Sequence, residues 1–234
     1  LLVDPVRPTT LKTRIVAHSQ QVVRFDREST APTGPALERE LQRHYAAAVA
    51  GVRAVIFEDY GKGLFQRGLL AGLQQLARRA RLITAADPNP RNPLPWRGLT
   101  VMTPNRREAF AAAGVPWSEP VDTVLEDAPL REVGKRLLAR WRPQHLLITL
   151  GEHGVCLFRR GARPHHIPTV ARAVFDVSGA GDTMIATFTL ALAAGAVPVE
   201  AAEIANHAAG VVVGKVGTAT CSPAELAASF DRHR

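Results

Sequence analysis

Short apolar runs alternate with longer amphipathic segments along most of this chain, a pattern that predicts strands followed by helices. Buried strands are predicted by the short runs at 54–57, 81–86, 99–102 and 145–150. Helices are predicted by the patterns at 35–50, 64–80, 105–113, 121–125, 130–141, 184–194, 198–213 and from 222 onward. Strands that alternate with helices indicate an α/β fold with a mainly parallel sheet covered on both faces.

Two segments predict antiparallel pairs within this scheme. Residues 12–26 alternate apolar and polar side chains with a break at Gln20-Gln21, which predicts two short strands. The run at 145–150 meets a Gly-Glu-His-Gly turn and continues as apolar residues 155–158, which predicts a hairpin. Residues 159–168 are expected to form a loop and an edge strand.

Length and composition fit one globular α/β domain over residues 1–234, and two small domains are also possible. The chain is 46% hydrophobic, and no apolar stretch reaches the roughly 20 residues that span a bilayer. Asp4 and Arg7 interrupt any apolar start, so no signal peptide is visible. Cys156 and Cys221 lie far apart without a Cys-x-x-Cys spacing, and we interpret them as buried thiols in a reducing compartment. A cytoplasmic location is therefore expected, with no membrane partner.

The balance of charge is basic, with 29 Lys and Arg against 21 Asp and Glu. A basic chain permits a polyanionic partner such as nucleic acid. The basic residues are scattered, however, and aromatic residues make up only 6% of the chain. A solvated arginine-rich surface is the better interpretation, and affinity for a small phosphorylated ligand is the second. No nucleic-acid partner is expected.

The segment Asp176-Val177-Ser178-Gly179-Ala180-Gly181-Asp182-Thr183 carries the clearest chemistry. Two glycines let the backbone turn sharply before an apolar helix, whose first turn has unpaired N–H groups and a partial positive charge. Such a turn predicts a phosphate site. Asp182 at its mouth suits a base that takes a proton from an attacking hydroxyl. A simple strand-to-helix turn with a capping aspartate is the alternative.

Other polar segments follow predicted strands, where open α/β sheets place ligand-binding groups. They are Glu58-Asp59-Tyr60-Gly61-Lys62-Gly63, Asp87-Pro88 and Thr103-Pro104-Asn105-Arg106-Arg107-Glu108. Asn105 and Glu108 also have the spacing of a helix capping box, which is a structural alternative to ligand binding. Lys12, Arg14 and Arg24 on the early strands either face an anion or serve as solubilising charges.

Three common signatures are absent. The Gly-x-x-x-x-Gly-Lys-Ser/Thr motif does not occur, because Gly61-Lys62 is followed by Gly63 and Ile56 stands in place of the first glycine. The dinucleotide motif Gly-x-Gly-x-x-Gly fails at Met184, and Gly-x-Ser-x-Gly fails at Asp176. These absences disfavour a P-loop NTPase, a dinucleotide-dependent oxidoreductase and an α/β-hydrolase.

The order of the remaining segments resembles the ribokinase-like (PfkB) carbohydrate kinase family, essentially from end to end of the chain. Within that family it looks most like the heptose-7-phosphate kinase domain of the ADP-heptose pathway. The segments that carry the resemblance are Lys12-x-Arg14, Gln20-Gln21, Arg24-x-Asp26, Asp59-Tyr60-Gly61-Lys62-Gly63, Asp87-Pro88, Thr103-Pro104-Asn105, the 176–183 turn and the 208–218 segment. The resemblance implies a three-layer sandwich in which residues 10–28 form lid strands at the substrate.

The resemblance also implies an activity, the ATP-dependent phosphorylation of the anomeric hydroxyl of D-glycero-D-manno-heptose 7-phosphate. The product would be the 1,7-bisphosphate, used for ADP-heptose and lipopolysaccharide core synthesis. Asp182 would be the general base, and Gly179, Ala180 and Gly181 would form the anion hole. Family members use ATP with Mg²⁺, some bind K⁺, and they commonly form homodimers.

Further roles come from the same resemblance. ATP would be contacted by Asn105, Arg106, Arg107, Glu108, Thr149, Gly151, Asn206 and Gly217. Asn105 and Glu108 would also hold Mg²⁺ indirectly, and a monovalent cation would lie near Asp176 and Ser178. The sugar phosphate would be contacted by Lys12, Arg14, Arg24 and Lys62.

Two departures from the family pattern keep alternatives open. The family's N-terminal part, with a sugar-gripping aspartate, is not found in this sequence, and Asn89-Pro90-Arg91-Asn92-Pro93 follows Asp87-Pro88 where Lys-Gly is usual. One alternative is therefore a kinase of another sugar or sugar phosphate. The other is a catalytically silent remnant that only binds nucleotide.

Overall fold

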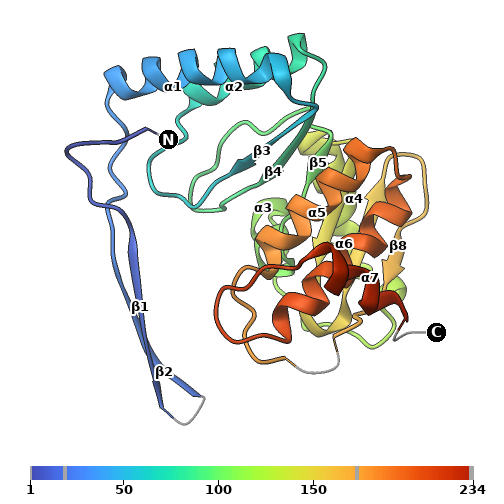
Figure 1. The fold of residues 1–234 in the computed structure, drawn as a ribbon. Coiled ribbons are helices and arrows are strands. Elements are labelled where there is room, and N and C mark those ends of the chain that lie inside the picture. Colours follow the sequence, from blue (N-terminus) through green and yellow to red (C-terminus); the bar gives the residue numbers. More distant parts are fainter. Residues whose placement is uncertain (1, 18–19, 172–173, 232–234) are drawn as a thin grey trace.

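A six-stranded sheet organises most of the molecule, described by a computed structural model over residues 2–17, 20–171 and 174–231 (Figure 1). The strand order is β3-β4-β5-β6-β7-β8. Neighbouring strands from β3 to β6 are parallel, and the β6–β7 and β7–β8 pairs are antiparallel. The strands are β3 (Ala54–Glu58), β4 (Ile83–Asp87), β5 (Val101–Met102), β6 (His145–Thr149), β7 (Val155–Arg159) and β8 (His165–Ile167). The predicted mainly parallel sheet, hairpin and edge strand are confirmed.

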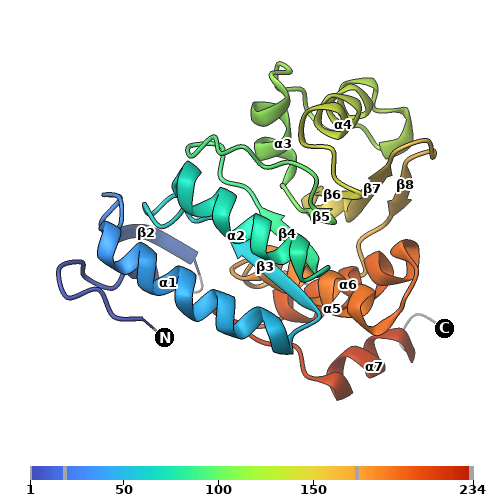
Figure 2. The ribbon, with the colours of Figure 1, turned by 90° about the horizontal axis from the view of Figure 1, so that it is seen from above.

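Helices cover both faces of this sheet, which gives the three-layer sandwich (Figure 2). One apolar core lies beneath α2 (Arg67–Arg79), α3 (Arg106–Ala113) and α4 (Ala128–Trp141). The other lies beneath α5 (Ala180–Ala194) and α6 (Pro198–Val213), whose small side chains let the two helices approach closely. Helix α1 (Pro35–Ala48) packs against α2, and α7 (Pro223–Asp231) packs against α6. The predicted three-layer sandwich is thus the observed fold.

Residues 11–17 and 20–27 form a separate two-stranded antiparallel sheet, which we call the arm (Figure 1). Its strands are β1 (Leu11–Ala17) and β2 (Gln20–Arg27). Lys12 faces Asp26 and Arg14 faces Arg24 across the pair, and because side chains alternate along a strand these four share one face. The other face carries exposed apolar side chains, among them Ile15 and Phe25. The two predicted short strands are confirmed.

Two local predictions are wrong. The segment predicted to be helical at 121–125 forms only a 3₁₀ turn at Val124–Glu126, because Asp127 caps α4 immediately afterwards, accepting from Leu130 N–H at 2.8 Å. Cys156 is buried as expected, but Cys221 is only partly buried, since it lies in the loop before α7. No helix of the described residues is long and apolar enough to cross a membrane.

Candidate active site

Asp182 lies in the first turn of α5, at the carboxyl-end side of the parallel strands. Helix α5 begins at Ala180 after Gly179, whose φ of 82° is left-handed and strained for residues with a side chain. The amides of this first turn lack acceptors within the helix, so the turn favours an anion. The carboxylate of Asp182 accepts a hydrogen bond from Tyr60 Oη at 3.0 Å, which joins α5 to the segment after β3.

Other carboxyl groups gather around Asp182 at the ends of β3 and β4. Burial and the Asp182 charge raise the pKa of Glu58 to about 7. Burial raises the pKa of Asp87 to about 8, with further contributions from Glu108, Glu58, Asp182 and Asp59. One carboxyl oxygen of Asp87 is buried without a hydrogen-bond partner. This concentration of negative charge would be relieved by a cation or by donors from a ligand.

A divalent ion carried by a nucleotide fits these donors. Mg²⁺ prefers oxygen ligands and usually keeps several waters, with one or two carboxylates and the substrate phosphates. Glu58, Asp87 and Glu108 offer such oxygens. Within the described ranges no group of three or more His, Cys, Asp or Glu side chains is arranged to hold a metal by itself. The arrangement therefore suits an ion that arrives with phosphates.

The segment after β3 is held in place by Asp59, a buried carboxylate that belongs to a predicted polar segment but for which no individual role was predicted. It accepts from Gly61 N–H at 2.9 Å and from Asn92 Nδ2 at 3.0 Å, and Asn92 also donates to Phe65 O at 3.2 Å. The Asn-Pro-rich loop after β4 is thereby tied to the segment that carries Tyr60. The polar, glycine-containing tail after β3 was the available signal for these residues.

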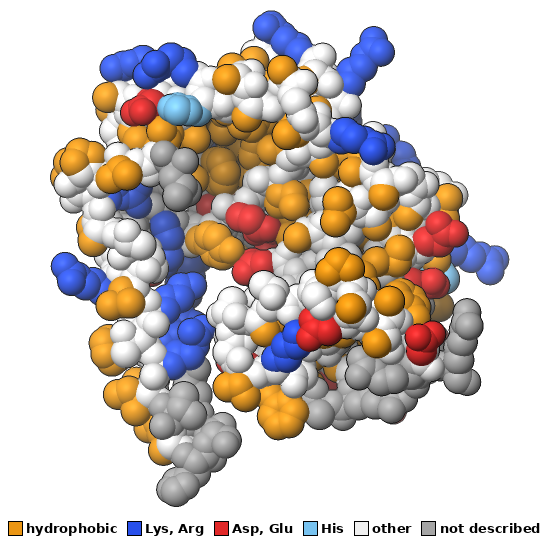
Figure 3. Space-filling view, viewed as in Figure 1, with side chains coloured by type: hydrophobic (Ala, Val, Ile, Leu, Met, Phe, Trp, Pro, Cys, Tyr) orange, Lys and Arg blue, Asp and Glu red, His pale blue; other side chains and the backbone are white. Residues whose placement is uncertain are grey.

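The charged face of the arm lies opposite the first turn of α5. Lys12 Nζ lies 5.7 Å from the centre of the Tyr60 ring, and Arg14 donates to Ser178 Oγ at 3.3 Å. In Figure 3, Lys and Arg side chains gather on the side of the arm that faces the body, across from Asp and Glu side chains. The fold thus brings two of the four predicted sugar-phosphate contacts to the α5 turn.

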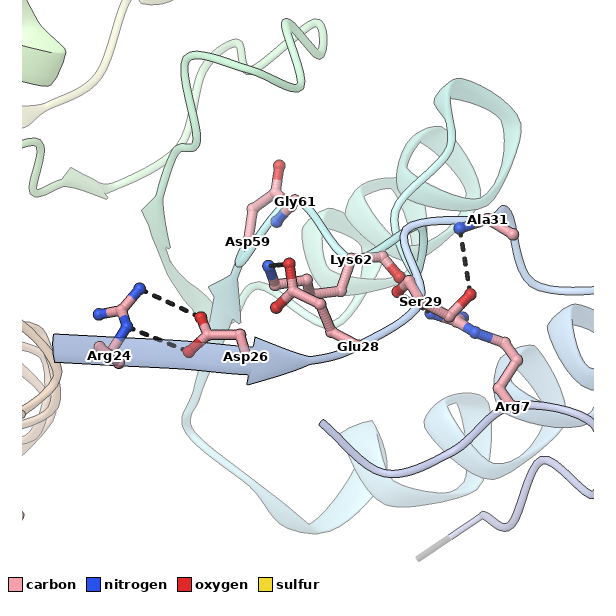
Figure 4. Close-up of polar contacts among 9 residues, drawn as sticks. All are labelled: Arg7, Arg24, Asp26, Glu28, Ser29, Ala31, Asp59, Gly61 and Lys62. Carbon is pink, nitrogen blue, oxygen red and sulfur yellow. Dashed lines mark hydrogen bonds and ion pairs between the residues drawn. The ribbon is translucent and has the colours of Figure 1, made fainter. Parts of the chain in front are cut away.

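The other two predicted contacts, Arg24 and Lys62, are paired within the chain (Figure 4). Arg24 Nε lies 3.1 Å from the Asp26 carboxylate, and Lys62 forms an ion pair with Glu28. Arg7 donates to the Ser29 carbonyl at 3.1 Å and to the Lys62 carbonyl, holding the base of the arm against the body. A ligand phosphate would have to compete with these carboxylates.

A cleft of about 600 Å³ adjoins the α5 turn, between the β6–β7 turn and α6. It brings together predicted residues from distant parts of the chain: Thr149, Gly151, Ala180, Gly181 and Asn206. Asn206 is buried, and its Nδ2 donates to the Pro168 carbonyl at 2.7 Å. Its amide therefore fixes the wall of the cleft.

Asp176 links the α5 turn to the Gly217 loop. Hydrogen bonds from the Ser178 hydroxyl and from Ser178 N–H, the latter at 2.8 Å, lower the pKa of the Asp176 carboxyl group, and the Arg14 charge and the Gly217 amide add to this effect. Gly217 is not among the residues that line the 600 Å³ cleft. The fold brings together Asp176, Ser178 and Gly217, but a cation there stays a prediction.

Four predicted ATP contacts at the start of α3 have clear structural roles. Asn105 and Glu108 form a complete capping box, with bonds of 2.9 and 3.0 Å. Arg106 is buried and pairs with Asp127 at 2.8 Å, so its guanidinium belongs to the core rather than to an open surface. Arg107 is exposed and lies 5.5 Å from the Trp117 ring. Asn105 bridges to Thr149, which keeps α3 beside the cleft.

Comparisons with known proteins agree with this fold. The model of the pfkB family of carbohydrate kinases matches residues 1–225, and the chain belongs to this family. Its fold is similar to that of phosphofructokinase-2 from Escherichia coli solved with potassium, with a TM-score of 0.75, 16% identity and coverage of 95% of this chain and 70% of that one. Ribokinase from Thermotoga maritima gives a TM-score of 0.72 at 21% identity, covering 96% and 70%.

Closer relatives in sequence are bifunctional HldE proteins. The protein from Geobacter sulfurreducens is 44% identical over 227 residues, covering 97% of this chain and 45% of the relative. The protein from Mesorhizobium japonicum is 42% identical over 226 residues, covering 97% and 44%. The chain therefore spans a little under half the length of these relatives.

Proposed function

We propose that this chain transfers the γ-phosphoryl group of ATP to the anomeric hydroxyl of D-glycero-D-manno-heptose 7-phosphate, giving the 1,7-bisphosphate and ADP. The observation that carries the proposal is the position of Asp182, in a helix turn whose residues Ala180 and Gly181 line the 600 Å³ cleft. Membership of the carbohydrate kinase family supports the reaction type. A plant ribokinase of similar fold was solved with ribose and ATP, which supports ATP as donor.

In this proposal each group has a defined task. The Asp182 carboxylate takes the proton of the sugar hydroxyl as its oxygen bonds to the γ-phosphorus and the bond to ADP breaks. The amides of the α5 turn hold the negative oxygens of the transferring group. Mg²⁺, when bound with ATP, neutralises charge on the phosphates, and the carboxylates around Asp87 would hold it through water or directly. Tyr60 positions the Asp182 carboxylate.

The arm gives the proposal its substrate class. Lys12 and Arg14 present two cations over the α5 turn and have no carboxylate bound to them in the described part of the chain. A sugar that already bears a phosphate would bind there through charge-assisted hydrogen bonds. The Lys12-x-Arg14 and 208–218 segments resemble the heptose branch of the family, which favours the 7-phosphate of a heptose. A potassium ion near Asp176 and a homodimer remain predictions.

The test is ADP release from Mg-ATP with and without D-glycero-D-manno-heptose 7-phosphate. Asp182→Asn should lower the sugar-dependent rate by about 10²–10⁴-fold, the usual contribution of a general base. Asp122→Asn, an exposed loop carboxylate, is the matched control and should keep the rate. Faster turnover with ribose or fructose 6-phosphate would mean that the substrate is another sugar and not the heptose. No release with any sugar, despite nucleotide binding, would favour a silent nucleotide-binding domain.

A further inference from the structure

A second cavity, which we call the basic pocket, lies between α4 and the turn after β7. Its volume is about 640 Å³. Five of its lining side chains are cationic: Arg131, Lys135, Arg142, Arg159 and Arg160. No Asp or Glu lines it. The remaining lining is small or apolar, with the ring of Phe158 buried beneath it.

The fold brings these cations together through one close contact between α4 and β7. A Cβ on Gly134 would lie 2.4 Å from the Phe158 ring, so only glycine lets β7 approach α4 this closely. Arg159 and Arg160 follow Phe158 directly, and Lys135 follows Gly134. Arg142 caps the C-terminus of α4. Its backbone is in the left-handed region, with φ of 53°, which is an unfavourable conformation for a residue with a side chain. Charges from two elements therefore share one hollow.

The protein itself makes little use of these charges. In residues 2–17, 20–171 and 174–231, none of the five side chains forms a hydrogen bond or an ion pair, and the Nε atom of Arg159 is buried without a partner. Glu132, a carboxylate on the same helix, is bound to Arg136 at 2.7 Å. The Arg159 charge also adds to burial in lowering the pKa of His145. Like charges are thus held together, and no carboxylate of the described residues forms an ion pair with any of the five, although Glu132 lies close enough to Lys135 for its charge to be felt.

A hollow on α1 provides a comparison. It is of similar size, about 650 Å³, but its two arginines, Arg39 and Arg43, share it with Glu40. Clustered cations repel one another and destabilise the fold unless an anion neutralises them. Guanidinium groups bind phosphate oxygens in pairs of parallel hydrogen bonds, and one carboxylate would neutralise only one of five charges.

From these observations we propose that the basic pocket binds a small ligand with two or more phosphate groups. The pocket lies near the start of β6, at the opposite end of the parallel strands from the α5 turn. Arg159 lies opposite His145 at the start of β6, whereas Thr149 at the end of β6 lines the 600 Å³ cleft, which the proposed function assigns to the nucleotide and which we call the nucleotide cleft. Ligand and nucleotide therefore occupy separate sites and bind without direct competition.

The experiment is a titration of the ¹⁵N-labelled chain with inorganic tripolyphosphate at low salt, in the presence of saturating Mg-ADP. The amide of Gly161 reports on the basic pocket, and the amide of Gly181 reports on the nucleotide cleft. We expect a saturable shift of the Gly161 resonance. The Gly181 resonance should not shift, because ADP already occupies the nucleotide cleft. The double variant Lys135→Gln/Arg160→Gln replaces two exposed cations of the basic pocket. It should raise the Kd obtained from the Gly161 shift tenfold or more.

The matched control is Arg39→Gln/Arg43→Gln, which removes the same charge from α1 and should leave the Gly161 response unchanged. Adding Arg142→Gln to the pocket variant should abolish the response, and thermal unfolding followed by circular dichroism verifies that each variant is folded. The proposal would be overturned if the Gly161 resonance did not shift. It would also be overturned if binding weakened equally in the pocket and control variants, because equal weakening indicates only a general attraction of an anion to a basic protein.

Discussion

Tyr60 Oη donates a hydrogen bond of 3.0 Å to the carboxylate of Asp182, across 122 positions of the chain. Burial raises the pKa of Tyr60, and the Asp182 charge and this hydrogen bond raise it further, so the hydroxyl stays protonated and able to donate. Tyr60 also lies beneath Lys12 of the arm. One side chain therefore links the arm, the end of β3 and the first turn of α5.

Replacing Tyr60 by Phe should lower kcat/KM for the sugar phosphate about tenfold. A hydrogen bond to a charged group contributes roughly 1.5–3 kcal/mol, part of which water replaces at this exposed site. Tyr45→Phe is the control, because the Tyr45 hydroxyl is buried without a partner and lies away from Asp182. Steady-state ADP release measures both. Equal rates for Tyr60→Phe and the unmodified chain would remove Tyr60 from the positioning of Asp182.

Lys12→Met and Arg14→Met should each raise KM for the sugar phosphate about tenfold with a smaller change in kcat. Each removes a cation from the arm face that lies over the α5 turn, and one charge-assisted hydrogen bond is worth roughly 1.5–3 kcal/mol. Arg27→Met is the matched variant, since Arg27 faces Leu11 on the other side of the arm. An equal rise of KM in all three variants would indicate general electrostatic attraction instead of a contact.

The carboxyl groups of Glu58, Asp87, Glu108 and Asp182, which we call the acidic cluster, should make the folded state less stable as pH rises. The pKa of Asp87 is raised from 3.8 to about 8 and that of Glu58 from 4.5 to about 7, so both groups bind protons on folding at intermediate pH. Their contribution is complete below about pH 4 and is lost as pH rises through 7 to 8. Asp87→Asn should therefore flatten the fall of unfolding free energy between pH 5 and 8.

The size of that effect should be on the order of 2 kcal/mol, after discounting the value implied by the pKa for partial exposure. Urea unfolding at a series of pH values measures it, and Asp122→Asn provides a carboxylate outside the cluster. If Asp87→Asn and the unmodified chain have the same slope against pH, then the Asp87 carboxyl is not held protonated by its neighbours. Added Mg-ADP should also reduce the slope, because its Mg²⁺ ion would stabilise the ionised carboxylates.

Arg106→Met should cost roughly 3–5 kcal/mol of stability, because it leaves the Asp127 carboxylate buried without its partner. Arg136→Met breaks an ion pair of similar length, with Glu132, but at an exposed position, and should cost less than about 1 kcal/mol. Urea unfolding compares the two. Similar small losses in both would mean that Arg106 is not part of the core.

Gly134→Ala should destabilise the chain by about 1–3 kcal/mol, because the added methyl group overlaps the Phe158 ring. Gly68→Ala in α2 meets open space and should instead stabilise by about 0.5–1 kcal/mol through helix propensity. Thermal and urea unfolding measure both changes. A neutral Gly134→Ala would show that β7 can move away from α4, which would also loosen the basic pocket.

Local chemistry in the sequence determined much of this protein. Hydrophobic periodicity predicted nearly every strand and helix, because a buried side of a strand or helix must repeat with its own geometry. The Asn105–Glu108 capping box and the 176–183 turn were also visible, since their partners lie within a few residues. The 121–125 prediction failed because the apolar pattern was too short for a helix and Asp127 started α4 instead.

Tertiary structure alone decided which of these residues meet. The Tyr60–Asp182 contact, the turn of the arm toward Ser178 and the raised pKa of Asp87 all depend on elements far apart in the chain. Arg106 and Arg107 are adjacent and identical in type, yet one is buried against Asp127 and the other is exposed. Sequence records the charge of a side chain, but its burial and partners arise only when the sheet brings separate segments together.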